Sequence, residues 1–283
     1  MQACAIFRGH GVLTMMQGCV WNRSGRAALN HDVSSYGFLN MKAISCKTCP
    51  LQECELLLPH DHERKSFLED FKAGEMTVEP GTQILLEGAM TPNLYTVLDG
   101  MGLRDKTLRD GRRQVINFVM PGDFLGLQAG VMGEMTNSVE AVTPMRLCVF
   151  RRDDLWTLFR NQPELSYALT WIAAAEEHFL GETIATLGQR DGKERIAWAL
   201  LKLFQRMQGL GLGENRRVPL PFRQQDLADA LGLSLVHTNK TLARLRSEGV
   251  ANWSNGHLTV PDAEALATVA VTDPEPVQKR PFL

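Results

Sequence analysis

Closely spaced turn signals between residues 74 and 152 constrain the fold of this chain more than any other feature. Short apolar stretches separate these signals, which are Pro80-Gly81, Asp99-Gly100, Asp110-Gly111 and Pro121-Gly122-Asp123. Short strands joined by turns at such intervals are typical of a small antiparallel sandwich or jelly roll. In the last expected strand, 145–150, Leu147 and Val149 share one face, while Cys148 and Phe150 share the other.

Residues 161–190 predict one long helix. Pro163 and Glu164 suit its first turn, and apolar residues then recur at steps of three, four and seven. A helix of about 25 residues is too long to pack only on a small sandwich, so we expect a coiled-coil-like homodimer. The alternative is a helix buried within the monomer. Copies of Glu176 and Glu177 would repel each other, which favours a marginal dimer. The candidate dimer contacts are Ile172, Phe179, Leu180, Ile184 and Leu187.

The segment 191–270 has the pattern of a winged helix-turn-helix. An amphipathic stretch, 222–231, is followed by a turn at Gly232 and by a second helical stretch that Ser234 can cap. Asn255-Gly256 predicts a hairpin, which would form the wing. This order is typical of DNA-binding domains.

The second helical stretch of this segment is rich in basic and hydrogen-bonding side chains, with no acidic residue before Glu248. Local basicity fits a helix inserted into a DNA groove, although the formal net charge of the chain is −2. The alternative is a helix pair of this shape that never contacts DNA. We expect double-stranded DNA as the partner. The candidate contacts are Arg223, Ser234, His237, Asn239, Lys240, Arg244 and Arg246.

Three cysteines, Cys46, Cys49 and Cys54, lie close together in the sequence, and Cys148 follows in the expected last strand of the sandwich. Four thiolates suit an iron–sulfur cluster or a zinc ion. Taken alone, Cys148 is better explained as a small buried hydrophobic residue of a strand. We see no secretory signal before these cysteines, and a disulfide would need an oxidising compartment. We therefore expect reduced thiols in a cytoplasmic protein.

Other classes of protein have little support in the sequence. No apolar run approaches the roughly 18 residues of a membrane span, so no membrane partner is expected. The sequence contains no P-loop, nucleophile elbow, metalloprotease zinc motif or paired-carboxylate constellation, so we expect no enzymatic activity. His60 and His62 could bind a metal ion, but they border a charged stretch, 61–65, and are expected to be solvated.

The sequence therefore predicts an α+β protein of five parts. Residues 1–45 lack periodicity and are expected to form a disordered arm, with translation starting at Met1 or at Met41. The other expected parts are a cysteine loop with a β-sandwich sensor domain over 46–160, a dimerisation helix over 161–190, a DNA-binding domain over 191–270 and a disordered tail over 271–283.

The order of cysteine cluster, β-sandwich, long helix and winged helix-turn-helix resembles the CRP/FNR family of bacterial transcription regulators, over about residues 45–265. The resemblance implies an N-terminal cyclic-nucleotide-binding-like β jelly roll, a long dimerisation helix and a C-terminal winged helix-turn-helix. The cysteines resemble those of the oxygen-sensing FNR branch, which hold a [4Fe–4S] cluster; here these would be Cys46, Cys49, Cys54 and Cys148. The resemblance also implies that the cluster controls dimerisation and DNA binding, and that RNA polymerase is a partner.

The sequence departs from the family pattern in two places. Residues 124–130 and 135–139 lack the glutamate and arginine with which the cyclic-AMP branch reads the ligand, so no cyclic nucleotide is expected. The recognition helix has Val236 and Lys240 where FNR- and CRP-type members have glutamate and arginine, so a different DNA sequence is expected. The alternative function is a regulator of the same build that senses zinc, thiol oxidation, haem or another small-molecule signal.

Overall fold

The computed structural model describes residues 19–21, 27–29, 44–274 and 277–283. The chain divides into two compact units, Met1–Asn40 and Met41–Leu283. In the first unit, β1 (Cys19–Trp21) pairs antiparallel with β2 (Ala27–Leu29). The rest of the arm predicted over 1–45, apart from residues 44 and 45, lies outside the described residues.

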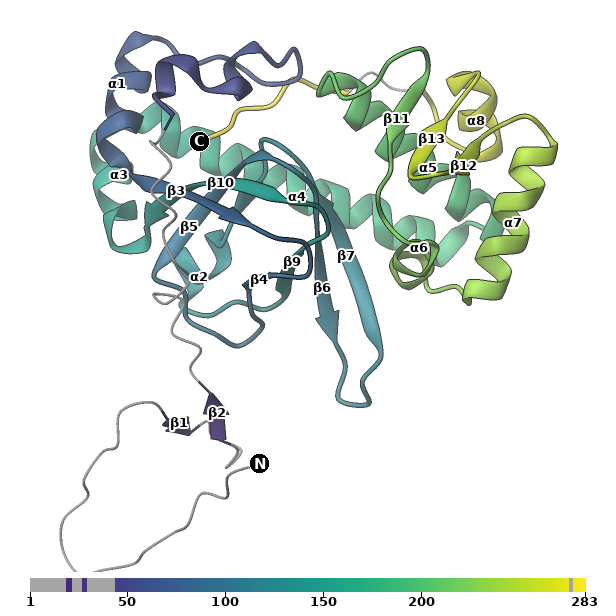
Figure 1. Ribbon diagram of the computed structural model, residues 1–283, viewed down its shortest axis with the longest axis horizontal. Helices are drawn as coiled ribbons and strands as arrows, with labels where there is room; N and C mark the ends of the chain where they lie inside the picture. The colour runs from purple at the N-terminus through teal and green to yellow at the C-terminus, as the bar shows by residue number, and fades with distance from the viewer. Residues whose placement is uncertain (1–18, 22–26, 30–43, 275–276) are drawn as a thin grey trace, which may run out of the picture. The chain divides into compact units, whose positions relative to one another are not determined.

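Two four-stranded antiparallel sheets form a sandwich in the second unit, which confirms the predicted β-sandwich (Figure 1). The strand order of one sheet is β3 (Lys72–Val78), β10 (Met145–Arg151), β5 (Asn93–Asp99) and β8 (Phe124–Leu125). The order of the other is β4 (Gln83–Leu85), β9 (Ser138–Ala141), β6 (Gly102–Thr107) and β7 (Arg113–Val119). Gly100 shows why the turn after β5 requires glycine. Its φ is +87°, and a Cβ there would lie 2.2 Å from the Pro144 carbonyl oxygen.

Strand β10 faces two different cores, as the alternation of its side chains predicts. Leu147 and Val149 pack between the two sheets. Cys148 and Phe150 face a second core, built with helices on the outside of the sheet. These helices are α1 (His62–Phe71), α3 (Leu155–Asn161) and the first half of α4 (Pro163–Gln189); the short α2 (Leu127–Met132) follows β8.

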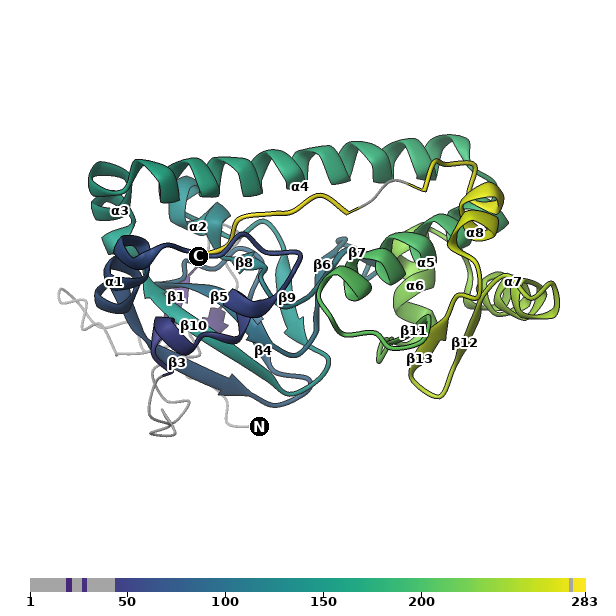
Figure 2. The same cartoon turned by 90° about the horizontal axis from the view of Figure 1, so that it is seen from above.

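The long helix α4 extends from the sandwich to the DNA-binding helices (Figure 2). The predicted dimer contact at Ile172 is wrong, because this side chain is 3% exposed and packs in the core beneath the helix. Phe179 stacks on Trp198 of α5, with ring centroids 6.0 Å apart. Leu180 and Ile184 are exposed, at 40% and 69% of their surface. The alternative of a helix buried within the monomer therefore holds for the first half of α4, whereas the second half is open on one side.

The predicted repulsion between copies of Glu176 also needs correction. Glu176 faces the sandwich of its own chain, where its carboxylate lies 2.8 Å from Arg104. Asn117 of β7 donates to the same carboxylate at 3.4 Å. Glu177 remains exposed on the helix.

The DNA-binding domain has the predicted winged helix-turn-helix. Its helices are α5 (Gly192–Gly209), α6 (Gln224–Leu231), α7 (Leu235–Ser247) and α8 (Ala263–Val269). Its sheet has the order β11 (Arg217–Pro219), β13 (His257–Thr259) and β12 (Asn252–Ser254). Gly232 ends α6 with a φ of +64°, and Ser234 caps α7 by accepting from the backbone N–H of His237 at 3.2 Å.

An apolar core joins the sandwich to the DNA-binding domain. Phe118 of β7 meets Phe222 edge to face, with ring centroids 4.7 Å apart. Leu103 and Met120 of the sandwich belong to the same cluster as the buried face of α5. Burial of such residues is the main favourable contribution to packing, so the two domains are held together in this structure.

The C-terminal segment is ordered where it is described, which corrects the disorder predicted over 271–283. Residues 277–283 return from the DNA-binding domain to the sandwich, and the C-terminus lies beside the loop that contains the cysteines (Figures 1 and 2). The Arg280 N–H donates to the Leu56 carbonyl, and the Leu58 N–H donates to the Arg280 carbonyl, both at 2.9 Å. Phe282 and Leu283 are 2% and 4% exposed. The sequence of this segment has no periodicity that would have predicted its burial, because its contacts are with residues far away in the chain.

Replacing Phe282 with alanine is expected to lower the free energy of unfolding by about 3 kcal/mol, because it removes a buried ring. Urea unfolding of the full chain measures this change. Val277→Ala, in the same segment but 39% exposed, is the matched control and is expected to cost less than about 0.5 kcal/mol. Equal effects of the two substitutions would show that the segment contributes nothing by docking.

Candidate cysteine site and DNA-binding surface

Three of the four predicted cysteine ligands line one small cavity. The short 3-10 helices η2 (Cys46–Thr48) and η3 (Pro50–Glu53) bring Cys46 and Cys49 over the outer face of β10, where Cys148 lies. The cavity has a volume of about 20 Å³, close to that of one water molecule. The structure therefore brings together thiols that are distant in the sequence, around a small space.

Cys54 does not join this cavity. Its Sγ lies 3.7 Å from the Gly209 carbonyl oxygen, at the end of α5. Within the part of the chain that the structure describes, no three histidine, cysteine or acidic side chains are arranged as ligands of one metal ion. The sequence spacing grouped Cys54 with Cys46 and Cys49, but the backbone turns it toward the DNA-binding domain.

Burial controls the protonation of the three cavity thiols. It raises the pKa of Cys46 to about 12, and the negative charge of Glu69 acts in the same direction. Burial also raises the pKa of Cys49 and of Cys148, against the opposing effect of the Lys72 ammonium for Cys148. At neutral pH the three side chains are therefore thiols, and binding of a metal would release their protons.

His60 belongs to the wall of this cavity, so its predicted solvation is wrong. Its side chain is 6% exposed and its ring lies against Phe282, with centroids 4.3 Å apart. Burial lowers its pKa to about 4, and the charges of Arg64 and Lys65 add to this shift. Among the described residues its Nε2 has no hydrogen-bond partner. His62 is exposed, as predicted. The C-terminal segment covers His60, and no local sequence signal indicates this.

The cysteine loop is attached directly to the DNA-binding domain. The Leu56 N–H donates to the Gly209 carbonyl at 3.2 Å, beside the contact of Cys54 with the same oxygen. The C-terminal segment, which continues from the DNA-binding domain, pairs with the next residues of the loop. A change in the cysteine loop can therefore act on the end of α5 and on this segment without any intervening element.

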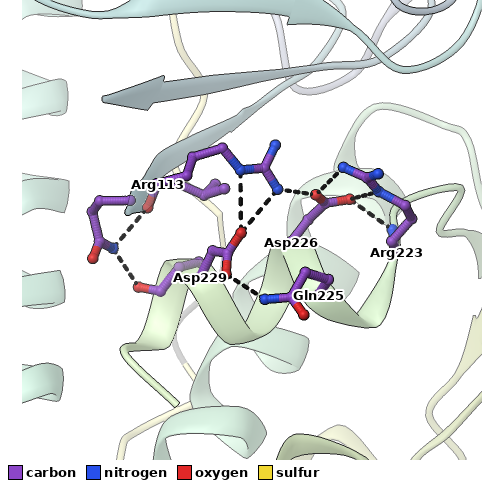
Figure 3. A network of polar contacts seen from close by, with 8 residues as sticks. Arg113, Arg223, Gln225, Asp226 and Asp229 are labelled. Atoms are coloured by element: carbon purple, nitrogen blue, oxygen red, sulfur yellow. Dashed lines mark hydrogen bonds and ion pairs between the residues drawn. The ribbon is translucent and has the colours of Figure 1, made fainter. Parts of the chain in front are cut away.

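A second connection joins the β6–β7 hairpin to α6 (Figure 3). Arg113 of β7 forms ion pairs with Asp226 and Asp229, with a distance of 3.0 Å to Asp229. Gln114 donates to the Ala230 carbonyl at 3.0 Å. Burial alone would raise the pKa of Asp226, but hydrogen bonds from Arg223 and Arg113 outweigh it and hold the pKa below its usual range. The hairpin thus fixes the helix that precedes the recognition helix.

Some of the predicted DNA contacts are exposed, whereas others form ion pairs within the protein. Asn239, Lys240 and Arg246 are exposed on α7. Arg244 pairs with Glu248 at 2.8 Å, and Arg223 pairs with Asp226 at 2.9 Å.

Of the remaining two candidates, Ser234 supports the fold locally, whereas the His237 side chain is exposed. Ser234 serves as the cap of α7. His237 lies against the start of α5, where a Cβ on Gly192 would be 2.2 Å from its Nε2. The opposite face of α7 is buried, through Thr238, Thr241, Leu242 and Leu245.

A β-sandwich, a long helix and a winged helix-turn-helix with an exposed basic helix define a DNA-binding regulator with a second, β-sandwich domain. Residues 194–269 match the model of the Crp-like helix-turn-helix domain, and residues 75–162 match that of the cyclic nucleotide-binding domain. Within the described residues, no helix has the length and apolar character needed to cross a membrane.

Similar proteins place the chain in a family. The nitrogen fixation regulation protein FixK of Bradyrhizobium diazoefficiens is 32% identical, over 66% of this chain and 79% of that protein. The transcriptional activator protein FnrL of Cereibacter sphaeroides is 26% identical, over 81% of this chain and 92% of that protein. The structure of FixK2 from Bradyrhizobium japonicum matches with a TM-score of 0.63 and 25% identity, over 69% of this chain and 96% of that one. The chain belongs to the CRP/FNR family of transcription regulators, whose members bind DNA as dimers and are not enzymes.

Replacing Arg113 with methionine is expected to lower the free energy of unfolding by about 2 kcal/mol at pH 7, because buried Asp226 loses one of its two partners. The pKa of Asp226 in the folded protein lies below its ordinary value of 3.8. The stability that its charge contributes is therefore fully present above pH 3.8 and is lost as the pH falls through the lower pKa of the folded state. Urea unfolding at several pH values should show the difference between variant and parent shrinking below pH 3.8.

Arg112→Met is the matched control, since the neighbouring side chain is 77% exposed and pairs only within the hairpin. Its effect is expected to stay within about 0.5 kcal/mol at every pH. A cost of Arg113→Met that does not change in acid would contradict the proposed contribution of Asp226.

Proposed function

We propose that this regulator senses oxygen or redox state through a [4Fe–4S] cluster bound at the cysteine site. Cys46, Cys49 and Cys148 would supply three thiolates and Cys54 the fourth. The observation that carries the proposal is the meeting of three cysteines from two distant segments at one cavity. A cluster of this kind supplies iron and sulfide that react with oxygen, so that its loss reports on oxygen.

The fit of the site to a cluster is partial. The donor set has the right chemistry, because thiolates are the usual ligands of iron–sulfur clusters. The cavity of about 20 Å³ is too small for the cluster, and Cys54 contacts Gly209 instead of the cavity. Binding of a cluster by all four cysteines therefore requires the cysteine loop to move away from β10 and the Cys54 thiol to leave the Gly209 carbonyl.

One observation favours zinc as a second candidate. The unpartnered Nε2 of His60 and the three thiols of Cys46, Cys49 and Cys148 line the same cavity. Three cysteines and one histidine are a common zinc ligand set, and a single ion needs less space than a cluster. These four side chains are not arranged as ligands of one ion among the described residues, so zinc binding would require them to turn toward one another, while Cys54 would stay on α5.

The contacts of the loop support a route from the cysteines to DNA. Movement of Cys54 away from Gly209 would release the end of α5. Movement of the loop would also disturb the pairing of Leu56 and Leu58 with Arg280. The state of the cysteine site would then alter how the DNA-binding domain is held on the sandwich, and with it dimerisation and DNA binding.

We propose that the homodimer forms through the open side of α4. Leu180 and Ile184 are its large exposed apolar residues, and Leu187 is half-buried beside them. Gly181 lies on the same side, and a Cβ there would meet no atom within 4 Å, so a second helix could approach closely. In such a dimer two copies of α7 would read double-stranded DNA, with Asn239 and Lys240 toward the bases and Arg246 toward phosphate.

Three further properties complete the proposal. The protein acts in the cytoplasm and contacts RNA polymerase when it is bound beside a promoter. The sandwich takes no cyclic nucleotide, because residues 124–139 contain no arginine that could hold the ligand's phosphate. Saturable binding of cyclic AMP to the purified protein would contradict this last property.

Protein purified under strictly anaerobic conditions is expected to be brown and to carry about four irons per chain. Serine in place of any one of Cys46, Cys49, Cys54 and Cys148 should remove the colour and most of the iron, since each supplies one ligand. Iron and sulfide analysis with an absorption spectrum measures this. Cys4→Ser and Cys19→Ser are the controls and should leave both unchanged.

A colourless anaerobic protein with one zinc ion per chain would exclude the cluster. In that case, loss of zinc in His60→Ala but not in Cys54→Ser would support the mononuclear site instead. If every cysteine variant kept the metal of the parent protein, whether iron or zinc, the cysteine site would be excluded altogether.

Ile184→Glu is expected to convert the dimer to a monomer and to weaken binding to a palindromic DNA site by at least tenfold, because it places a charge in an apolar contact. Sedimentation and a DNA shift assay measure the two effects. Val236→Glu, at a position 65% exposed on α7, is the control for the oligomeric state. It should remain a dimer while its DNA binding changes. A dimer of unchanged affinity in Ile184→Glu would mean that another surface forms the interface.

A further inference from the structure

A second cavity, separate from the cysteine site, lies between β7, α4, α5 and the C-terminal segment. Its volume of about 310 Å³ falls within the range of small-molecule sites. Phe118, Phe179 and Leu203 contribute apolar walls. The cavity is outside the interior of the sandwich and touches both the sensor and the DNA-binding domain. A ligand bound there would contact both domains at once.

The polar wall of this cavity carries an excess of positive charge. Arg206 and Arg280 share a single carboxylate, that of Asp123, which is 4% exposed. Lys202 also lines the cavity, and so does Glu176, whose carboxylate is paired with Arg104. The cavity wall and its partners thus hold four cations, Arg104, Lys202, Arg206 and Arg280, and two carboxylates, Asp123 and Glu176.

The two neighbouring guanidinium groups are not fully compensated. Burial lowers the pKa of Arg280, and the charge of Arg206 adds to this effect against the attraction of Asp123 and Glu176. A buried charge without a full partner is costly, and an anion beside it would reduce that cost.

Three buried N–H donors on the wall of this cavity also lack acceptors. They are Nε1 of Trp198 and the Nε atoms of Arg206 and Arg280, none of which has a hydrogen-bond partner in the described part of the chain. Trp198 is 3% exposed, so bulk water does not reach its ring. A buried donor left without a partner costs about 1–3 kcal/mol. All three belong to side chains that line the cavity, so small rotations of these side chains would present them to a group with several acceptor oxygens.

We propose that this cavity binds a small organic anion, with a carboxylate or phosphate group on an apolar or aromatic body. The anionic oxygens would accept from Trp198, Arg206 and Arg280, with Lys202 adding charge, and the body would lie against Phe118 and Phe179. Because the walls come from the sandwich, α4, α5 and the C-terminal segment, the bound anion stabilises this arrangement of the two domains. The cavity contains no cysteine in its wall, but it shares Leu56 and Arg280 with the contacts of the cysteine loop.

Isothermal titration and thermal unfolding of the full chain test the proposal, with benzoate and phenyl phosphate as probes and benzyl alcohol and inorganic phosphate as controls. Saturable binding of one or both organic anions, with a rise in Tm, is expected, and the tighter probe identifies the anionic group. Benzyl alcohol should not bind, because it lacks the charge. Inorganic phosphate should bind at least tenfold more weakly than phenyl phosphate, because it lacks the apolar body.

Two variants and one control locate the binding. Lys202→Met removes a cation from the wall, and Trp198→Phe removes one donor while keeping an aromatic ring; each should weaken binding at least tenfold. Lys279→Met, next to Arg280 but exposed, should bind as the parent does. No saturable binding of either organic anion, equal affinity for phosphate and phenyl phosphate, or equal losses in Lys202→Met and Lys279→Met would overturn the proposal.

Discussion

One buried carboxylate connects three parts of this regulator. Asp123, in the turn after β7, pairs with Arg206 of α5 and with Arg280 of the C-terminal segment, and it also accepts from the Met120 N–H at 2.9 Å. Sandwich, DNA-binding domain and C-terminal segment therefore meet at a single charge. Burial acts to raise the pKa of Asp123, but the positive charges of Arg206 and Arg280 hold it below its usual range. The carboxylate therefore remains ionised beside the two arginines.

The C-terminal segment extends this connection to the cysteines. Within four residues, Arg280 reaches Asp123, its backbone pairs with the cysteine loop, and Phe282 covers His60. The same loop contacts the end of α5 through Cys54 and Leu56. The cysteine cavity is therefore close to the DNA-binding domain along the chain, because the segment that follows α8 is itself part of the cavity wall.

The two halves of the helix-turn-helix are held differently. The β6–β7 hairpin fixes α6 through Arg113, and the apolar core around Phe222 holds the start of the domain. On α7, by contrast, Asn239, Lys240 and Arg246 remain exposed. The domain is thus docked through the helix that supports recognition while the reading surface stays accessible. A signal that loosens the docking would change the position of that surface without altering its chemistry.

Local pattern in the sequence determined the strands, the alternation of Leu147 and Cys148 across β10, the long helix and the cap of α7 at Ser234, because each depends on residues close together in the chain. The resemblance to the family grouped Cys46, Cys49, Cys54 and Cys148, and the structure brings three of them, Cys46, Cys49 and Cys148, to one cavity. Local pattern did not place Cys54 on Gly209, Glu176 on Arg104 or Phe282 on His60. Those contacts join segments far apart in the sequence, and their energy depends on shape and burial that exist only after the domains have packed. For the same reason a disordered tail was expected where the tertiary structure provides a buried segment.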